Sequence, residues 1–195
     1  CTSLKVAPDL PVTTLAYSCY RSMFEGCTSL TTPPELPATT FDGGNYVHSH
    51  YAAMFKDCTS LTTAPELPMT VLPESCYYQM FEGCTSLTNI PNELPATTLN
   101  ASCYARMFAG CESLSASPHL PATSLVYRCY EEMFYGCSNL TEISASFVTE
   151  PSDAYTYNWV EGVSPWGYFY KSSEATWDVT GSNGVPEGWY VYNWN

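Results

Sequence analysis

Ten cysteines carry the widest range of chemistry in this chain, because a thiolate can bind a metal, attack a substrate or form a disulfide. They stand at regular intervals in two series, unlike the close pairs that hold zinc. The first series is Cys1, Cys27, Cys58, Cys84, Cys111 and Cys137, and the second is Cys19, Cys76, Cys103 and Cys129. Within one repeat the two series lie about 12 Å apart along a helix, too far for a disulfide. The cysteines therefore either pack as reduced core thiols or form disulfides between coils, or between Cys1 and Cys19.

Histidines mark the one irregular repeat. The step from Cys27 to Cys58 is 31 residues where the others are 26 or 27, and His50 stands where the other repeats have cysteine. Insertions in repeat proteins map to loops, often on the binding face. The candidate ligand-contacting residues of this loop, 42–50, are Asn45, Tyr46, His48 and His50. A solvated loop and a metal site using Asp42 are alternatives, but two loop histidines are weak support for a metal, and we predict none.

Aromatic residues at the C-terminal end offer a second candidate site. Residues 147–195 contain all five tryptophans and no cysteine. We expect Trp159, Trp177 and Trp189 to form a core there. The candidate ligand-binding residues are Trp166, Tyr168, Tyr170, Tyr190, Tyr192 and Trp194. Alternation along a strand puts the last three on the face opposite Trp189, where they could stack on sugar rings or anchor a protein.

Catalytic motifs are missing from the sequence. Its three histidines fall in no nucleophile or zinc motif, and no glycine-rich phosphate loop occurs. Four acidic residues at one corner of successive repeats could attract calcium or form a solvated ridge: Asp9, Glu35, Glu66 and Glu93. We predict no enzyme activity, no cofactor and no metal.

Charge and hydropathy limit the partners. Asp and Glu outnumber Lys and Arg by 19 to 6, for a net charge of -13, which repels nucleic acids and anionic membranes. No apolar stretch approaches the roughly 18 residues that span a bilayer, so we expect no membrane insertion. The motif Cys-Thr-Ser-Leu at residue 1 recurs at residue 27, so the chain is expected to begin inside a repeat.

The elements that position these residues follow from the repeat. Between Ser18 and Cys27, Tyr20 and Phe24 are four residues apart, which is typical of one helix face, and Gly26 is suited to end a helix. The preceding half of each repeat contains prolines that limit any strand to about three residues. We therefore predict about five coils over residues 1–146, each with a short strand, a proline corner and a short helix. Equivalent residues should stack in two columns, leucines from Leu30 to Leu140 and buried phenylalanines from Phe24 to Phe134. Residues 147–195 are predicted to form a small β-rich cap.

A family resemblance supports this assignment. The pattern Met-Phe-x-Gly-Cys-x-x-Leu occurs at 23–30, 80–87, 107–114 and 133–140. It resembles the 26-residue surface repeat of BspA-like leucine-rich-repeat proteins. The resemblance implies an α/β repeat solenoid, a right-handed leucine-rich-repeat stack, located extracellularly or on a bacterial cell surface, with adhesion as the usual role. It implies no catalytic residues.

The function expected from these features is recognition. We predict an extracellular, non-enzymatic recognition or adhesion module, on a bacterium or a phage tail fibre. It would bind a protein or glycan on a cell surface through the aromatic tail and the 42–50 loop. The alternative is a structural spacer that projects another domain. An exposed aromatic cluster separates the two, because a spacer has no reason to keep one.

Overall fold

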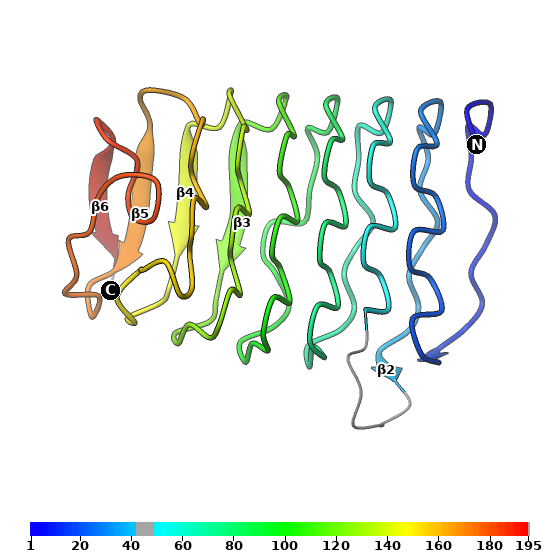
Figure 1. Cartoon of the computed structure of the whole chain (residues 1–195), viewed down its shortest axis with the longest axis horizontal. Helices are drawn as coiled ribbons and strands as arrows, with labels where there is room; N and C mark the ends of the chain where they lie inside the picture. The colour runs from blue at the N-terminus through cyan, green and yellow to red at the C-terminus, as the bar shows by residue number, and fades with distance from the viewer. Residues whose placement is uncertain (42–48, 195) are drawn as a thin grey trace.

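The computed structural model describes residues 1–41 and 49–194 of the chain, and these form a parallel β-solenoid of about seven turns. The coils stack along one axis, with the N-terminal end of the chain at one end of the stack and the C-terminal end at the other (Figure 1). Each coil covers the apolar side chains of its neighbours, which no single coil could bury.

Two parallel sheets supply the regular strands. Near the N-terminus, β1 (Thr14–Leu15) pairs with β2 (Thr40–Phe41). At the C-terminal end, four strands form one sheet in the order β3-β4-β5-β6. Their bounds are Ala116–Leu120, Glu142–Ala145, Tyr168–Ser172 and Tyr190–Trp194. The strands β5 and β6 lie beyond residue 146, and the β4–β5 pairing continues the sheet into this part of the chain.

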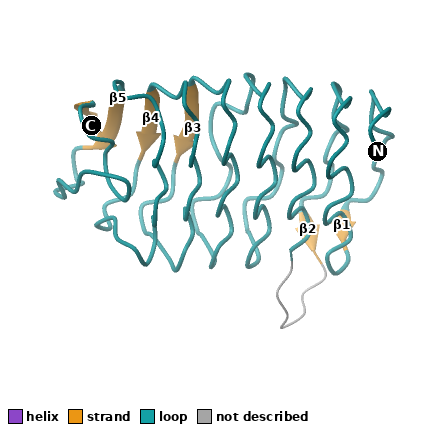
Figure 2. Cartoon of the chain, turned by 45° about the horizontal axis from the view of Figure 1, so that its top comes forward, coloured by secondary structure: helices purple, strands orange, loops and turns teal. Residues whose placement is uncertain are grey.

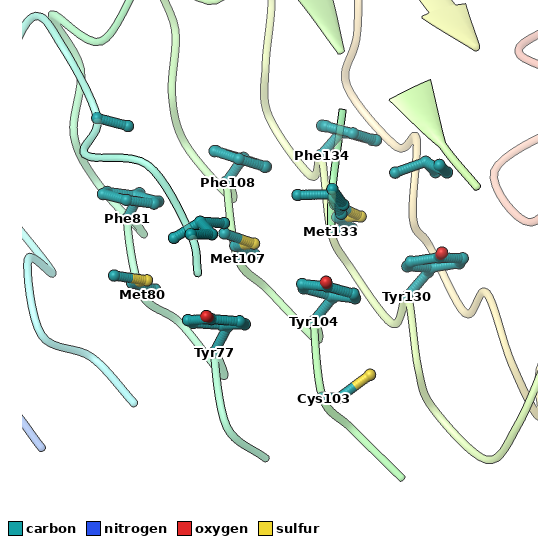
Figure 3. Close-up of a cluster of buried hydrophobic side chains, with 14 of the residues drawn as sticks. Tyr77, Met80, Phe81, Cys103, Tyr104, Met107, Phe108, Tyr130, Met133 and Phe134 are labelled. Atoms are coloured by element: carbon teal, nitrogen blue, oxygen red, sulfur yellow. The ribbon is translucent and has the colours of Figure 1, made fainter. Parts of the chain in front are cut away.

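The core consists of side-chain columns that run along the stack. Five phenylalanines, Phe24, Phe55, Phe81, Phe108 and Phe134, stack with ring centroids 5.5 to 5.9 Å apart. A parallel column of tyrosines includes Tyr77, Tyr104 and Tyr130 (Figure 3). The leucine column is also buried: Leu30, Leu61, Leu87, Leu114 and Leu140 have no exposed surface. The expected Phe and Leu columns are therefore confirmed.

The predicted short helices are wrong. The described residues contain no helix, and the segments assigned to helices are coloured as loops and turns (Figure 2). In such a segment, the amides of Tyr77, Gln79 and Phe81 donate to carbonyls of the next coil, at 3.0, 3.0 and 2.9 Å. The amides between them donate three residues back, as Met80 does to Tyr77 at 3.1 Å. A helix would instead send each amide to the carbonyl four residues earlier.

A four-residue periodicity explains the error. In the third coil, Ser75, Gln79 and Gly83 have positive φ, so the chain makes one tight turn every four residues. Residues four apart, such as Tyr77 and Phe81, then share a face, as they would on a helix with 3.6 residues per turn. The glycines do adopt the left-handed backbone expected of them, but inside a run of turns. The chain is therefore a β-solenoid, and the assignment to an α/β leucine-rich-repeat stack is overturned.

The cysteines are free, and most of them are buried. All ten are unpaired, and only Cys1 and Cys19 are exposed. Each thiol of the first series from Cys58 to Cys137 donates to a phenylalanine carbonyl of a neighbouring coil, for example Cys84 Sγ to Phe55 O at 3.1 Å. Burial raises the pKa of Cys58 and of Cys137 to about 12, so neither forms a reactive thiolate near neutral pH. The structure thus agrees with reduced core thiols.

An ionic chain links four successive coils on the outside of the stack. Glu82 accepts from Lys56 Nζ at 3.1 Å and from Arg106 Nε at 3.0 Å, and Arg106 also pairs with Glu132. Desolvation raises the pKa of Glu82, but hydrogen bonds from Arg106 and Lys56 outweigh it, so the net pKa lies below the ordinary value. Basic and acidic side chains alternate from coil to coil here. This alternation replaces the repulsion that like charges at one position of stacked coils would cause.

Replacing Phe81 tests the core. Phe81→Ala removes a fully buried ring between two stacked neighbours, so we expect a loss of about 3–5 kcal/mol in the free energy of unfolding. Val71→Ala, at a side chain 66% exposed, is the control and should change the free energy by less than about 0.5 kcal/mol. Urea denaturation followed by tyrosine fluorescence measures both. Equal losses would contradict the core assignment.

The ionic chain predicts a pH dependence. Because the folded-state pKa of Glu82 is lowered, its contribution is present above its unfolded pKa and is lost as pH falls through the folded value. Arg106→Ala should therefore destabilise by about 1 kcal/mol at pH 7, and the deficit should shrink below about pH 4. Arg128→Ala is the control, because Arg128 is half exposed and, within residues 1–41 and 49–194, forms an ion pair with Glu131 alone. A deficit that stays constant from pH 7 to pH 2.5 would disprove the assigned role of Glu82.

Candidate functional site

Exposed aromatic side chains gather on the last two strands of the solenoid. Along β5, Phe169 is fully buried, while Tyr168 and Tyr170 point to the opposite, solvent side. Along β6, Tyr190 and Tyr192 take the same side, because alternate residues of a strand share a face. Together with Trp194, these four tyrosines make up what we call the C-terminal aromatic surface.

The strand register brings the tyrosines into two stacked pairs. Tyr168 pairs with Tyr190 and Tyr170 with Tyr192 in the parallel β5–β6 ladder. The ring centroids are 6.0 Å apart in the first pair and 5.7 Å in the second, with planes within 30° of parallel. The rings therefore face along the stack. Tyr190 is 65% exposed and Tyr192 50% exposed, since their outer ring faces point past the last strand.

Trp194 extends the aromatic surface across the sheet. Its ring meets the ring of His119 edge-on, with centroids 5.5 Å apart, although the two residues belong to the outermost strands β6 and β3. His119 is fixed by the hydroxyls of Ser144, 2.8 Å from Nδ1, and Ser146, 3.0 Å from Nε2. Ser144 lies in β4 and Ser146 follows it. Their small side chains leave room for both rings above the sheet.

A polar groove adjoins this surface at His119. It is open, with a volume of about 490 Å³, and is lined by polar residues that include Asn89, Asn92, Ser117, Glu142 and Ser144. Glu142 lies close enough to Tyr170 to contribute, after desolvation, to a raised pKa of the phenol. The sheet thus presents aromatic rings at its C-terminal edge and hydrogen-bonding groups further along the stack.

Buried tryptophans support the aromatic surface from below. Trp159, Trp177 and Trp189 are at most 7% exposed, as expected for a core. Each indole N–H donates to a backbone carbonyl, at 2.9, 3.1 and 2.8 Å respectively. Lys171, on the inner side of β5, donates to the Trp177 carbonyl and lies 4.4 Å from the Trp177 ring centroid. Desolvation lowers the pKa of Lys171. The strands that carry the tyrosines are therefore firmly positioned.

The sequence-predicted site residues divide into three groups. Tyr168, Tyr170, Tyr190, Tyr192 and Trp194 lie together, and Trp166 is 58% exposed on the turn before β5. His50 is fully buried, with Nδ1 2.9 Å from the carbonyl of Ala16, so a surface ligand cannot reach it. Asn45, Tyr46 and His48 lie outside the described residues.

Sequence reasoning missed His119 and the two serines that hold it, Ser144 in β4 and Ser146 just after it. Their signal was present in the repeat length, because Ser144 and Tyr170 are 26 residues apart and pair across β4 and β5. Writing the sequence in rows of 26 residues would have placed His119, Ser144 and Tyr170 in the same or adjacent columns, whereas the step from Tyr170 to Tyr192 is only 22 residues.

In residues 1–41 and 49–194, no three His, Cys, Asp or Glu side chains are grouped closely enough to hold a metal ion. The same part of the chain has no helix with the length and apolarity needed to cross a membrane.

Comparison with protein-family models, curated proteins and solved structures finds no match for this chain. The relationship to the BspA-like surface repeats therefore stays a prediction from the sequence pattern alone.

Proposed function

We propose that this chain is a non-enzymatic recognition or adhesion module that binds its partner through the C-terminal aromatic surface. The observation that carries the proposal is the exposure of Tyr190 and Tyr192, at 65% and 50%, on a regular strand. Clustered apolar surface of this kind marks interaction sites in soluble proteins. Tyrosine also offers a large contact area at low cost in conformational entropy.

The supporting structure fits a binding role. The tyrosines are held in register by the β5–β6 ladder, so little order has to be gained on binding. The polar groove that meets the surface at His119 adds hydrogen-bonding groups beside the rings. Recognition sites commonly combine aromatic anchors with a polar rim. A location outside the cell or on its surface belongs to the same proposal and is supported by the sequence resemblance.

A spacer role is the competing proposal, and the regular stack favours it. A column of phenylalanines and a ladder of backbone hydrogen bonds run through successive coils, which makes the solenoid a stiff rod. A spacer, however, gains nothing from exposed tyrosines on its last strand. Loss of binding without loss of stability would separate the two.

The test replaces the two most exposed tyrosines of β6. Tyr190→Ser with Tyr192→Ser should leave the melting temperature within a few degrees of wild type, because both rings are largely solvated. Binding to intact cells, arrayed glycans or arrayed surface proteins should fall at least tenfold, about 1.4 kcal/mol.

The matched control changes two exposed tyrosines elsewhere. Tyr127→Ser with Tyr157→Ser alters side chains that are 57% and 44% exposed and lie outside the C-terminal aromatic surface. This variant should bind like wild type. If both double variants bind equally well, the aromatic surface is not the site and the spacer proposal moves ahead.

A further inference from the structure

The polar groove beside His119 crosses three coils of the stack. It is lined by residues from three segments, 88–92, 115–119 and 142–144, and further coils lie on both sides of it. Its volume of about 490 Å³ falls within the range of about 300–1,000 Å³ that is typical of small-molecule sites. The groove therefore has the size of a ligand site.

A β-bulge in β3 shapes the groove. Ala116 pairs with Glu142 and His119 with Ser144, so two residues of β3 stand opposite one residue of β4. Without the extra residue, alternation from Ala116 would put Pro118 on the outer face and His119 inside. The bulge instead buries Pro118 and brings His119 to the outer face, where it forms one wall of the groove. Bulges commonly reposition side chains next to functional sites.

Polar groups in the groove are available to a ligand. Within residues 1–41 and 49–194, the side chains of Asn92 and Glu142 make no hydrogen bond or ion pair. The Asn89 side chain donates from Nδ2 to Thr63 Oγ1 at 3.3 Å, which leaves its oxygen as an acceptor. Ala116 occupies the repeat position between Asn89 and Glu142, and its methyl group leaves the space above the sheet open.

Aromatic rings border the groove on the side of β5. Glu142 pairs with Tyr168 and Ser144 with Tyr170 in the β4–β5 ladder. Each of these tyrosines stacks on a tyrosine of β6 with one ring face, so its other face is directed toward β4 and the groove. Ring faces beside amide, carboxylate and hydroxyl groups suit a ligand that has an apolar face and polar edges.

We propose that the groove and the rings of Tyr168 and Tyr170 together bind a neutral or amino-substituted oligosaccharide that runs along the stack. This inference rests on the proposed recognition function and names its ligand class. A pyranose ring carries C–H groups on its faces and hydroxyls around its edge. The C–H groups pack on an aromatic ring, while the hydroxyls exchange hydrogen bonds with amides and carboxylates. One sugar unit lies among Asn89, Asn92 and Glu142, and the next unit lies against Tyr170.

Charge defines the ligand further. Among the described residues that line the groove, Glu142 carries a negative charge and none is a lysine or an arginine. The whole chain has a net charge of -13. A sulfate, phosphate or carboxylate group on a sugar would therefore be repelled, whereas the ammonium group of an amino sugar would be attracted to Glu142.

Two substitutions with matched controls isolate the groove. Ala116→Trp fills it from an exposed position, and Thr32→Trp puts the same side chain at the equivalent exposed position of an earlier coil. Glu142→Ala removes the carboxylate of the groove, and Glu150→Ala removes an exposed carboxylate outside it. Because all four positions are exposed, the melting temperatures should stay within a few degrees of wild type.

The probe is an array of neutral, amino-substituted and acidic sugars, from monosaccharides to hexasaccharides. Neutral or amino-substituted oligosaccharides should bind the wild-type chain, and acidic ones should not. The array member that binds best is then titrated by calorimetry. Thr32→Trp and Glu150→Ala should bind it like wild type, while Ala116→Trp and Glu142→Ala should bind it at least tenfold more weakly. The amide NMR signals of Ser117 and Ser144 should shift when the sugar is bound.

Other outcomes overturn the inference. They are binding of no oligosaccharide, a preference for acidic sugars, or equal binding to Ala116→Trp and Thr32→Trp. Tyr190→Ser with Tyr192→Ser separates this failure from that of the proposed function. If that double variant loses binding to cells or surface proteins while no oligosaccharide binds the wild-type chain, the aromatic surface is a recognition site and the inference fails. If the double variant binds cells like wild type while Ala116→Trp loses the oligosaccharide, the groove is the site and the proposed role of the aromatic surface fails.

Discussion

Backbone hydrogen bonds between successive coils are the interaction on which this structure depends. Every second amide of the turn segments donates along the stack, as Phe81 does to Met107 and Phe108 does to Met133. To direct those amides toward the next coil, the chain adopts positive φ at non-glycine residues such as Gln79 and Arg106. Each such residue costs about 1–2 kcal/mol. The strain persists only because each coil is held by its neighbours, so a single repeat has no stable fold of its own.

The same constraint produces the columns and the candidate site. Backbone hydrogen bonds between adjacent coils hold equivalent backbone positions about 4.8 Å apart along the axis. Identical side chains of successive coils must therefore stack. Inside the solenoid this gives the phenylalanine and tyrosine columns, and outside it gives the paired tyrosines of β5 and β6. Core and proposed recognition surface are therefore two results of one stacking rule.

The sequence was enough to predict the repeat length, the buried columns and the side of the sheet that each residue of the C-terminal segment takes. The repeat spacing aligned Phe81 with Phe108, and alternation assigned Trp189 inward and Tyr190 outward; all of these are confirmed. The local backbone could not be predicted, because a four-residue turn and a 3.6-residue helix both place Tyr77 and Phe81 on one face. The difference lies in where the amides donate, and no side-chain pattern reports that. His50 was misplaced for a related reason: its histidine side chain suggested a loop, while its repeat position makes it part of the core.

Hydrogen-bond scalar couplings test the central claim most directly. In uniformly ¹⁵N,¹³C-labelled protein, a coupling through the hydrogen bond identifies the carbonyl that accepts from a given amide. The stacked-turn account predicts a coupling between the Phe81 amide nitrogen and the carbonyl carbon of Met107, one coil further along, across an N–O distance of 2.9 Å. A coupling from the Phe81 amide to the carbonyl of Tyr77, four residues earlier, would show a helix and contradict the account.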